Sequence, residues 1–254
     1  MVKILFLVLS FLFSASEIKA DVLADTVEKL KPAIVAVGTF MPKRAPRAVF
    51  RGTGFAIADG SLVATNAHVI PEHLATENME KIAVFIKRNG KDTMYLTTVV
   101  AIDKEHDVAV LKLTEGRLSP LVLDMDLNVR EGDLFAFTGY PIGMVLGLYP
   151  ATHTGIVSAI TPVAIPMINA RQLNAKVMKR LRHPYKVYQM DAIAYPGNSG
   201  SPLFHPVTGK VVGIINSVFV KESKETILSR PSGISYAIPV KYLEKILSNY
   251  KSSL

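Results

Sequence analysis

From residue 33 onward the sequence is divided into short runs rich in Val, Ile and Thr, separated by turn-forming or charged clusters. Runs of this length and composition are typical of β-strands rather than helices. The first group predicts six strands, a number that fits one small barrel. These expected strands cover residues 33–39, 52–57, 62–65, 82–87, 94–102 and 108–113.

The same pattern resumes after a connecting stretch around residues 114–130. We therefore expect an all-β fold of two six-stranded antiparallel β-barrels of similar size. A short helix should precede them at residues 21–31, and another should follow Pro239, because apolar residues recur there at helical spacing. The second group of expected strands covers residues 134–138, 153–160, 188–190, 201–204, 211–220 and 233–238.

The first twenty residues have the pattern of a secretory signal peptide, with Lys3, an apolar run over 4–13 and a small residue at Ala20. An uncleaved anchor is the alternative, but this run is shorter than the roughly 20 residues that cross a bilayer. We expect an exported protein, periplasmic or secreted. The expected divisions are a signal peptide (1–20), the N-terminal helix with the first barrel (21–125), and the second barrel with the C-terminal helix (126–254).

Composition narrows the class of protein further. Hydrophobic residues make up 49% of the chain and charged residues 20%, which is the balance of a globular protein. The absence of Cys excludes disulfides and a lipid-modified cysteine anchor. The net charge of +8 favours anionic surfaces, but without a basic face interleaved with aromatic residues we expect no nucleic-acid partner.

The strongest local motif is the segment Gly197-Asn198-Ser199-Gly200-Ser201-Pro202, which lies between two expected strands. Glycines on either side of Ser199 allow left-handed backbone angles and let a carbonyl approach the amides of Gly197 and Ser199. Such a loop, formed by Gly197, Asn198 and Ser199, is an oxyanion hole. An ordinary turn has the same composition, so the motif needs a general base nearby.

His68 is the candidate base, because it follows an expected strand that runs into small and polar residues. The other five histidines lie in charged, turn-like or strand contexts that indicate ordinary surface or structural roles. Asp107 opens an alternating apolar strand and is the candidate acid that orients the imidazole. The order His, Asp, Ser, with the first two in one barrel and the third in the other, predicts a catalytic triad of His68, Asp107 and Ser199.

These residues resemble those of the HtrA/Deg-type bacterial serine proteases within the chymotrypsin-like fold, over nearly all of residues 22–247. The resemblance implies a serine endopeptidase with His68 as general base, Asp107 as orienting acid and Ser199 as nucleophile. It implies no cofactor and no metal. The segments that carry it are 52–55, 64–70, 107–113, Gly139-Tyr140-Pro141-Ile142-Gly143, 154–159, 197–202 and 235–239.

Two departures from the family pattern bear on function. Ser201 stands where the family usually has glycine, and the chain stops at Leu254, so we expect a short form without PDZ domains. With Ser201, the motif resembles the Gly-Asn-Ser-Gly-Ser-Pro sequence of the glutamyl endopeptidases, which have the same fold. A secreted protease of that type is therefore an alternative. Those enzymes carry a histidine on the strand that here reads 213–217, where none is found.

Substrate choice is expected to depend on Ile193, six residues before the nucleophile, with Ser217 and Val218 on the facing strand. An apolar pocket there would accept small or aliphatic residues before the scissile bond. Unfolded or misfolded polypeptides are the expected substrates. A non-catalytic holdase that binds peptides by strand addition beside Val218 is the rival function.

The basic segment from Arg171 to Lys186 has two interpretations. It is a solvated loop without a role, or a gate or weak anchor for anionic membrane or a partner. The family resemblance implies a homo-trimer, although residues 21–31 lack the aromatic residues that form the family's trimer contact.

Overall fold

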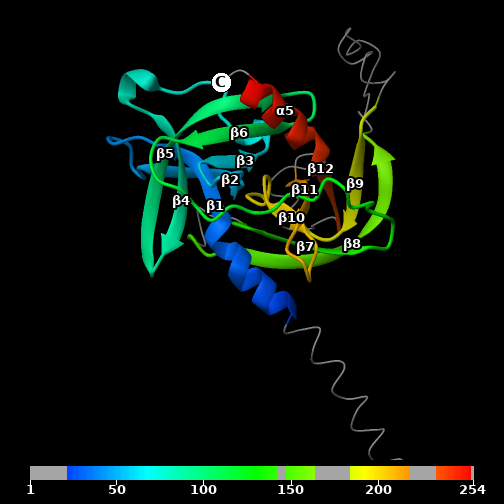
Figure 1. The fold of residues 1–254 in the computed structure, drawn as a ribbon. Helices are drawn as coiled ribbons and strands as arrows, with labels where there is room; N and C mark the ends of the chain where they lie inside the picture. Colours follow the sequence, from blue (N-terminus) through cyan, green and yellow to red (C-terminus); the bar gives the residue numbers. More distant parts are fainter. Residues whose placement is uncertain (1–21, 142–146, 164–183, 218–232, 253–254) are drawn as a thin grey trace, which may run out of the picture.

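The computed structural model describes residues 22–141, 147–163, 184–217 and 233–252. Its strands form two closed antiparallel barrels of six strands each, which lie side by side in Figure 1. The prediction of an all-β, two-barrel fold is confirmed. The buried seam between the barrels is where the candidate catalytic residues lie.

The first barrel contains every strand expected in the first half of the chain. Its strands are hydrogen-bonded in the order β1-β2-β3-β6-β5-β4, and β4 closes onto β1. Short runs rich in β-branched residues form these strands because such side chains pack well on a pleated surface. The strands are β1 (Ile34–Phe40), β2 (Ala48–Ile57), β3 (Leu62–Thr65), β4 (Lys81–Arg88), β5 (Lys91–Asp103) and β6 (Val108–Leu113).

The second barrel is ordered β10-β11-β12-β9-β8-β7, and β10 closes onto β7. All six expected strands are present, although residues 218–220 of the expected strand 211–220 lie outside the described residues. The strands are β7 (Leu134–Gly139), β8 (Ala151–Pro162), β9 (Lys186–Asp191), β10 (Pro202–Phe204), β11 (Val211–Asn216) and β12 (Ile234–Pro239).

Each barrel is filled by fully buried side chains, but the two cores are not separate. Phe55 and Leu111 fill the first barrel, whereas Phe137 and Met190 fill the second. Phe204 of β10 is fully buried and belongs to the same apolar cluster as the first barrel. This shared core fixes one barrel against the other and so fixes the relative position of residues across the seam.

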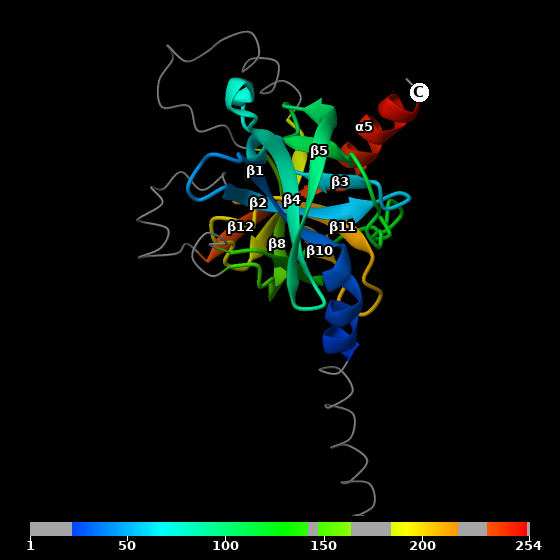
Figure 2. The same ribbon diagram turned by 90° about the vertical axis from the view of Figure 1, so that its left-hand side faces the viewer.

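The two terminal helices each contact the barrel that is more distant in the sequence. Residues 22–30 are helical, and Thr26 donates a weak hydrogen bond to the carbonyl of Val207 in the second barrel (3.4 Å). At the other end, α5 (Lys241–Ser252) packs Leu243 into the first barrel's core and contacts β5 and β6 (Figure 2). Within the described ranges, no helix is long and apolar enough to cross a membrane.

The N-terminal helix differs slightly from its prediction. Instead of ending at Pro32, the chain continues through it as a 3-10 turn over Lys31–Ala33. Proline is tolerated there because the first turn of a helix does not use its N–H groups.

Candidate active site

His68 lies in a short 3-10 turn, Ala67–Val69, directly after β3. Val69 is buried, whereas the His68 side chain is 29% exposed. Burial of the neighbouring apolar side chain fixes the turn and leaves the imidazole at the edge of the barrel. The strand end thus presents the ring to the seam, as the sequence predicted for this position.

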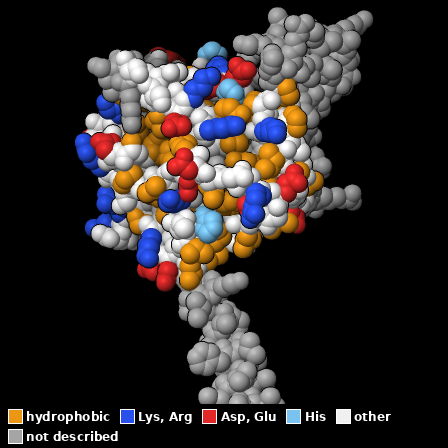
Figure 3. All heavy atoms as spheres, turned by 45° about the vertical axis from the view of Figure 1, so that its right-hand side comes forward, with side chains coloured by type: hydrophobic (Ala, Val, Ile, Leu, Met, Phe, Trp, Pro, Cys, Tyr) orange, Lys and Arg blue, Asp and Glu red, His pale blue; other side chains and the backbone are white. Residues whose placement is uncertain are grey.

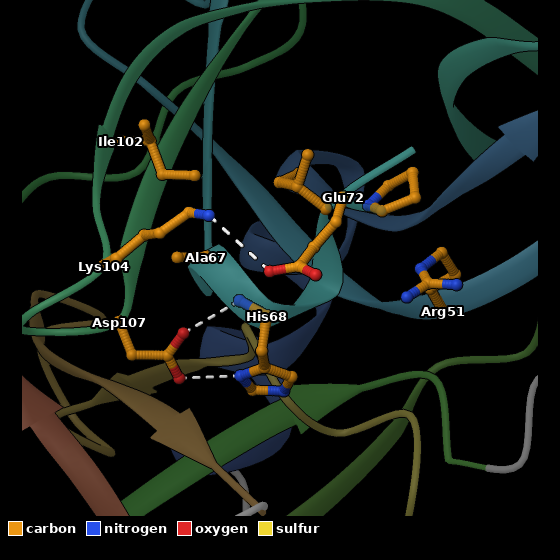
Figure 4. Close-up of a pocket in the computed structure, with 9 residues that line it drawn as sticks. Arg51, Ala67, His68, Glu72, Ile102, Lys104 and Asp107 are labelled. Carbon is orange, nitrogen blue, oxygen red and sulfur yellow. Dashed lines mark hydrogen bonds and ion pairs between the residues drawn. The ribbon is translucent and has the colours of Figure 1, made fainter. Parts of the chain in front are cut away.

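Asp107 lies in the turn between β5 and β6 and has a left-handed backbone, with φ of 55°. Its Oδ1 accepts a hydrogen bond from the backbone N–H of His68 (2.8 Å), and its Oδ2 is 2.6 Å from His68 Nδ1 (Figure 4). The Asp107 carbonyl also accepts hydrogen bonds from the amide of Ala67 (3.2 Å) and from Asn66 Nδ2 (3.0 Å). These contacts account for an otherwise unfavourable backbone conformation.

The pairing determines which nitrogen of His68 can act as a base. An ionised carboxylate only accepts hydrogen bonds, so Nδ1 must carry the proton that faces Asp107. Nε2 is then left unprotonated on the opposite edge of the ring. Sequence analysis predicted this partnership, and the structure brings the two residues together.

A second contact joins Asp107 to the other barrel. Asn216, at the end of β11, donates a hydrogen bond from Nδ2 to Asp107 Oδ2 at 2.5 Å. The acid therefore bridges the seam. Sequence analysis did not identify Asn216, although an asparagine that ends a fully apolar strand is a signal that could have indicated it.

Ser199 lies in the loop before β10, and its neighbours Gly197 and Gly200 have φ values of 101° and 91°. These left-handed angles confirm the expected reason for glycine at both positions. A Cβ on Gly200 would lie 1.9 Å from the carbonyl oxygen of Thr53, so the loop touches β2 directly. The Ser199 carbonyl accepts a hydrogen bond from the Thr53 amide (2.8 Å), which fixes the loop on the first barrel.

Thr53 fixes this loop at a second point that sequence analysis missed. Its Oγ1 donates a hydrogen bond to the Gly197 carbonyl (2.7 Å) and accepts one from the Tyr140 amide (2.9 Å). The Tyr140 hydroxyl donates to the carbonyl of Ile34 (3.1 Å), and burial raises the pKa of Tyr140 well above its ordinary value. The nucleophile loop, β1, β2 and the end of β7 are therefore one hydrogen-bonded unit.

The Ser199 hydroxyl is almost fully buried, with the residue 3% exposed. Its Oγ lies 2.5 Å from Oγ of Ser217 and accepts a weak hydrogen bond from the Ser217 amide (3.3 Å). Among the described residues, Ser217 is its partner, and no hydrogen bond joins Ser199 to His68. The structure thus places the three predicted residues along one seam but pairs the serine with its neighbour.

The amides expected to form the oxyanion hole differ in their partners. The Asn198 amide donates to the Tyr195 carbonyl (2.9 Å) and is already used. The amides of Gly197 and Ser199 have no acceptor within the described part of the chain. The Asn198 side chain is fully buried, and its polar atoms have no partner among the described residues.

The residues expected to select substrates are only partly described. Ile193 is half-buried in the segment between β9 and the nucleophile loop, and Ser217 directly follows β11. Val218 lies outside the described residues. The basic segment 171–186 also lies outside them, apart from residues 184–186. On the face shown in Figure 3, basic and acidic side chains are interspersed among apolar ones, and no single-sign patch is visible there.

A second His–Asp pair adjoins Asp107. His106 Nδ1 lies 2.6 Å from Asp103 Oδ2, and Asp103 Oδ1 accepts hydrogen bonds from the amides of Glu105 (2.8 Å) and His106 (3.1 Å). The His106 ring stacks on Tyr242 of α5, with 4.2 Å between ring centroids. Burial is the largest single influence on the pKa of Asp103 and raises it, but the hydrogen bonds from His106 and Glu105 together with the charge of the His106 ring lower it by more, so the net shift is downward.

His153 is a structural histidine, as its strand position indicated. Its ring stacks on Phe137 with 4.9 Å between ring centroids, and burial lowers its pKa. The described residues contain no group of three or more His, Asp or Glu side chains that could hold a metal ion. The chemistry available at the seam is that of a hydroxyl, an imidazole and a carboxylate.

Two barrels, a His–Asp pair and a serine loop on their common seam define the class of trypsin-like serine endopeptidases. The model of the trypsin-like peptidase domain matches residues 52–214, a range that includes His68, Asp107 and Ser199. The chain belongs to the trypsin-like peptidase family.

Within this family the chain is similar to HtrA-type proteases. Human serine protease HTRA3 is 30% identical over 245 residues, which cover 94% of this chain and 47% of that protein. Serine protease HTRA1A of Danio rerio is 29% identical over 234 residues, covering 91% and 41%. The chain therefore spans less than half the length of these relatives.

Solved structures of proteases are also similar to this chain. The serine endoprotease from Yersinia pestis superposes with a TM-score of 0.61 at 25% identity, covering 90% of this chain and 66% of that one. An HtrA-type protease with a tripeptide also has a TM-score of 0.61, at 26% identity, with coverage of 89% and 62%. The resemblance to HtrA-type proteases that the sequence predicted is confirmed.

Proposed function

We propose that this chain is a serine endopeptidase in which Ser199 is the nucleophile, His68 the general base and Asp107 the acid that orients it. The observation that carries the proposal is the 2.6 Å contact between His68 and Asp107 on the same seam as the Ser199 loop. A serine hydroxyl is a weak nucleophile at neutral pH and requires such a paired base.

The reaction requires one side-chain movement. Rotation of Ser199 about χ1 exchanges the Ser217 partner for His68 Nε2, and staggered side-chain rotamers interconvert without backbone change. His68 then takes the serine proton as Oγ attacks the scissile carbonyl. The amides of Gly197 and Ser199 are the proposed donors to the oxyanion, and each such donor contributes roughly 10²- to 10³-fold in rate.

The acyl-enzyme is resolved by the same residues. His68 donates its new proton to the leaving amine, which departs, and water then attacks the ester with His68 again acting as base. Asp107 keeps its contact with Nδ1 throughout and stabilises the imidazolium. Asn216, which donates to the same carboxylate oxygen, holds Asp107 in place from the second barrel.

Substrates are proposed to be unfolded or misfolded polypeptides, with small or aliphatic residues before the scissile bond. Ile193 supports this preference, since an apolar side chain at that position gives a basic substrate residue no counter-charge. Cleavage of a peptide library mainly after Lys, Arg or Glu would contradict it. We also propose that the protein is exported, on the basis of residues 1–20.

The oligomeric state and the basic segment 171–186 determine which partners the protein could have. A homo-trimer is proposed from the resemblance to HtrA-type proteases, and chromatography with light scattering tests it. For the basic segment 171–186, the solvated loop and the anionic anchor remain alternatives. Charge-neutral substitutions in that segment that leave liposome binding and activity unchanged would favour the solvated loop.

A non-catalytic holdase is the second candidate, and one observation favours it: Ser199 Oγ contacts Ser217 rather than His68. Digestion of an unfolded protein separates the two functions. If the protein is a serine endopeptidase, it should cleave the unfolded protein, and Ser199→Ala should abolish the cleavage. Ser201→Ala is the matched control, because the Ser201 hydroxyl has no hydrogen-bond partner among the described residues. Suppressed aggregation without cleavage by the native protein would favour the holdase.

A further inference from the structure

A pocket of about 520 Å³ adjoins the His68–Asp107 pair and is lined by charged groups as well as apolar ones. In Figure 4, Lys104 and Arg51 stand on opposite sides of Glu72 above the His68 ring. The pocket belongs to the first barrel and is distinct from Ile193 and Ser217, the residues proposed to select the side chain before the scissile bond. Its charges indicate which kind of side chain it binds.

Arg51 is held in a defined position on β2. Its Nε donates a hydrogen bond to the Val69 carbonyl (2.8 Å), next to His68. Arg51 is the extra residue of a bulge in β2, because Gly52 pairs with Val37 and Phe50 pairs with Gly38 on β1. The contact with Val69 and the shared pocket lining place the Arg51 side chain beside His68, where a substrate would react.

The charge of Arg51 is not neutralised by the protein. Arg51 is exposed and forms no ion pair within the part of the chain that the structure describes. Because Nε is already bonded, the two terminal nitrogens remain as a fork that matches the two oxygens of a carboxylate. A guanidinium fixed in this way loses little side-chain freedom when it binds.

The other charges around the pocket compensate one another. Glu72 Oε1 lies 3.6 Å from Lys104 Nζ, with both side chains well exposed, so the pair is weak but removes the repulsion that Glu72 alone would exert on an anion. The Asp107 carboxylate contacts His68 and Asn216. Arg51 is thus the positive charge in the pocket that is left for a ligand.

The proposed mechanism indicates which part of a substrate reaches Arg51. His68 must protonate the leaving amine through Nε2, on the ring edge opposite Asp107. The chain that follows the scissile bond therefore leaves across His68 and the neighbouring β2. We infer that Arg51 binds the carboxylate of an acidic substrate residue on the leaving-group side of the scissile bond.

This inference rests on the proposed function, and it can be tested in peptides that differ only in Glu or Gln at each of the first positions after the scissile bond. Glu and Gln have the same shape, so the kcat/KM ratio reports charge recognition. We expect the native protein to prefer Glu by about 5-fold at one position, as for an exposed charge-assisted contact. Arg51→Gln should reduce the ratio to about one.

Arg88→Gln is the matched control, because Arg88 is also on the first barrel and its Nη1 contacts the Tyr95 hydroxyl rather than the pocket. It should keep the native ratio. Salt should lower the native ratio, since exposed charge pairs are screened. A native ratio near one at every position, or a preference that survives in Arg51→Gln, would overturn the inference.

A binding measurement separates failure of this inference from failure of the proposed function. In the Ser199→Ala background, fluorescence anisotropy of the same labelled peptides reports affinity without cleavage. Tighter binding of the Glu peptide that Arg51→Gln removes would support the subsite even if no cleavage is found. Equal affinity for the Glu and Gln peptides, or no binding of either, would overturn it, whether or not the native protein cleaves.

Discussion

The two halves of the active site are held in different ways. On the first barrel, Asp107 forms hydrogen bonds through both carboxylate oxygens and its carbonyl, and the His68 ring is fixed by one of them. On the second barrel, the loop backbone is anchored to Thr53, yet the Ser199 hydroxyl is paired with Ser217. In the proposed mechanism, the His68–Asp107 pair is already formed, whereas the Ser199 side chain must still rotate away from Ser217.

The largest expected effect is on the pre-organised half. Asp107→Asn should lower kcat by about 10⁴-fold, because an amide can donate to Nδ1 and so stabilises the wrong tautomer of His68. Peptide cleavage measures the change, and thermal unfolding should show that the fold is kept. A loss of less than tenfold would mean that Asp107 does not orient the base.

Substitution of a glycine in the nucleophile loop should destabilise the fold, because the loop backbone is in contact with β2. Gly200→Ala should destabilise the protein by about 3 kcal/mol, because alanine adds both a strained left-handed angle and a clash with the Thr53 carbonyl. Denaturant unfolding measures this. Gly90→Ala is the control, since Gly90 has φ of 76° but nothing within 4 Å of its added Cβ. Equal costs at both sites would show that the loop is not pressed against β2.

A smaller effect is expected at the second His–Asp pair. Asp103→Asn should lower kcat about tenfold with little change in KM, because weaker hydrogen bonds to the 103–106 turn loosen the segment that positions Asp107. A change confined to KM would contradict this role. The conservative variant Asp103→Glu should recover part of the loss.

The pKa of Asp103 also predicts a stability effect with a defined sign. Its pKa in the folded protein lies below the ordinary value of 3.8, so its carboxylate stabilises the fold above pH 3.8 and this contribution is lost as the pH falls further. The difference in unfolding free energy between the native protein and Asp103→Asn should therefore shrink below about pH 4. A difference that grows under acid would contradict the assignment.

The smallest expected effect tests the resting position of Ser199. Ser217→Ala removes the hydroxyl that competes with His68 for Ser199. The rate of labelling by a fluorophosphonate should therefore rise about threefold, which corresponds to the net free energy of one neutral hydrogen bond. Ser235→Ala is a suitable control, because its buried hydroxyl has no partner among the described residues. A fall in labelling for Ser217→Ala would mean that Ser217 assists the nucleophile.

Most of the fold could be predicted from the sequence because strand periodicity is local. Each expected strand lies within a few residues of an observed one, as for residues 62–65 and β3. One clear difference is β2, which begins at Ala48 rather than residue 52, because Ala48 pairs with Phe40 on β1. Cross-strand pairing of this kind is not visible in a one-dimensional pattern.

The contacts across the seam could not be predicted, for the same reason. His68 and Asp107 were identified because each stands beside a strand with a clear apolar pattern. Asn216 had one local signal, its position at the end of an apolar strand, but its contact with Asp107 depends on how the two barrels pack. The contacts of Thr53 and Ser217 depend on the same packing, and nothing in their local sequence specifies it. The motifs therefore indicated His68 and Asp107, which the structure pairs, whereas the residues that connect the two barrels were missed.

Activation of Ser199 by His68 is tested most directly by mass spectrometry of the fluorophosphonate adduct. We predict one adduct, on the peptide that contains Ser199, formed slowly or not at all in His68→Ala and absent in Ser199→Ala. Labelling of the folded native protein at another residue, or equal labelling rates with and without the imidazole, would contradict the account.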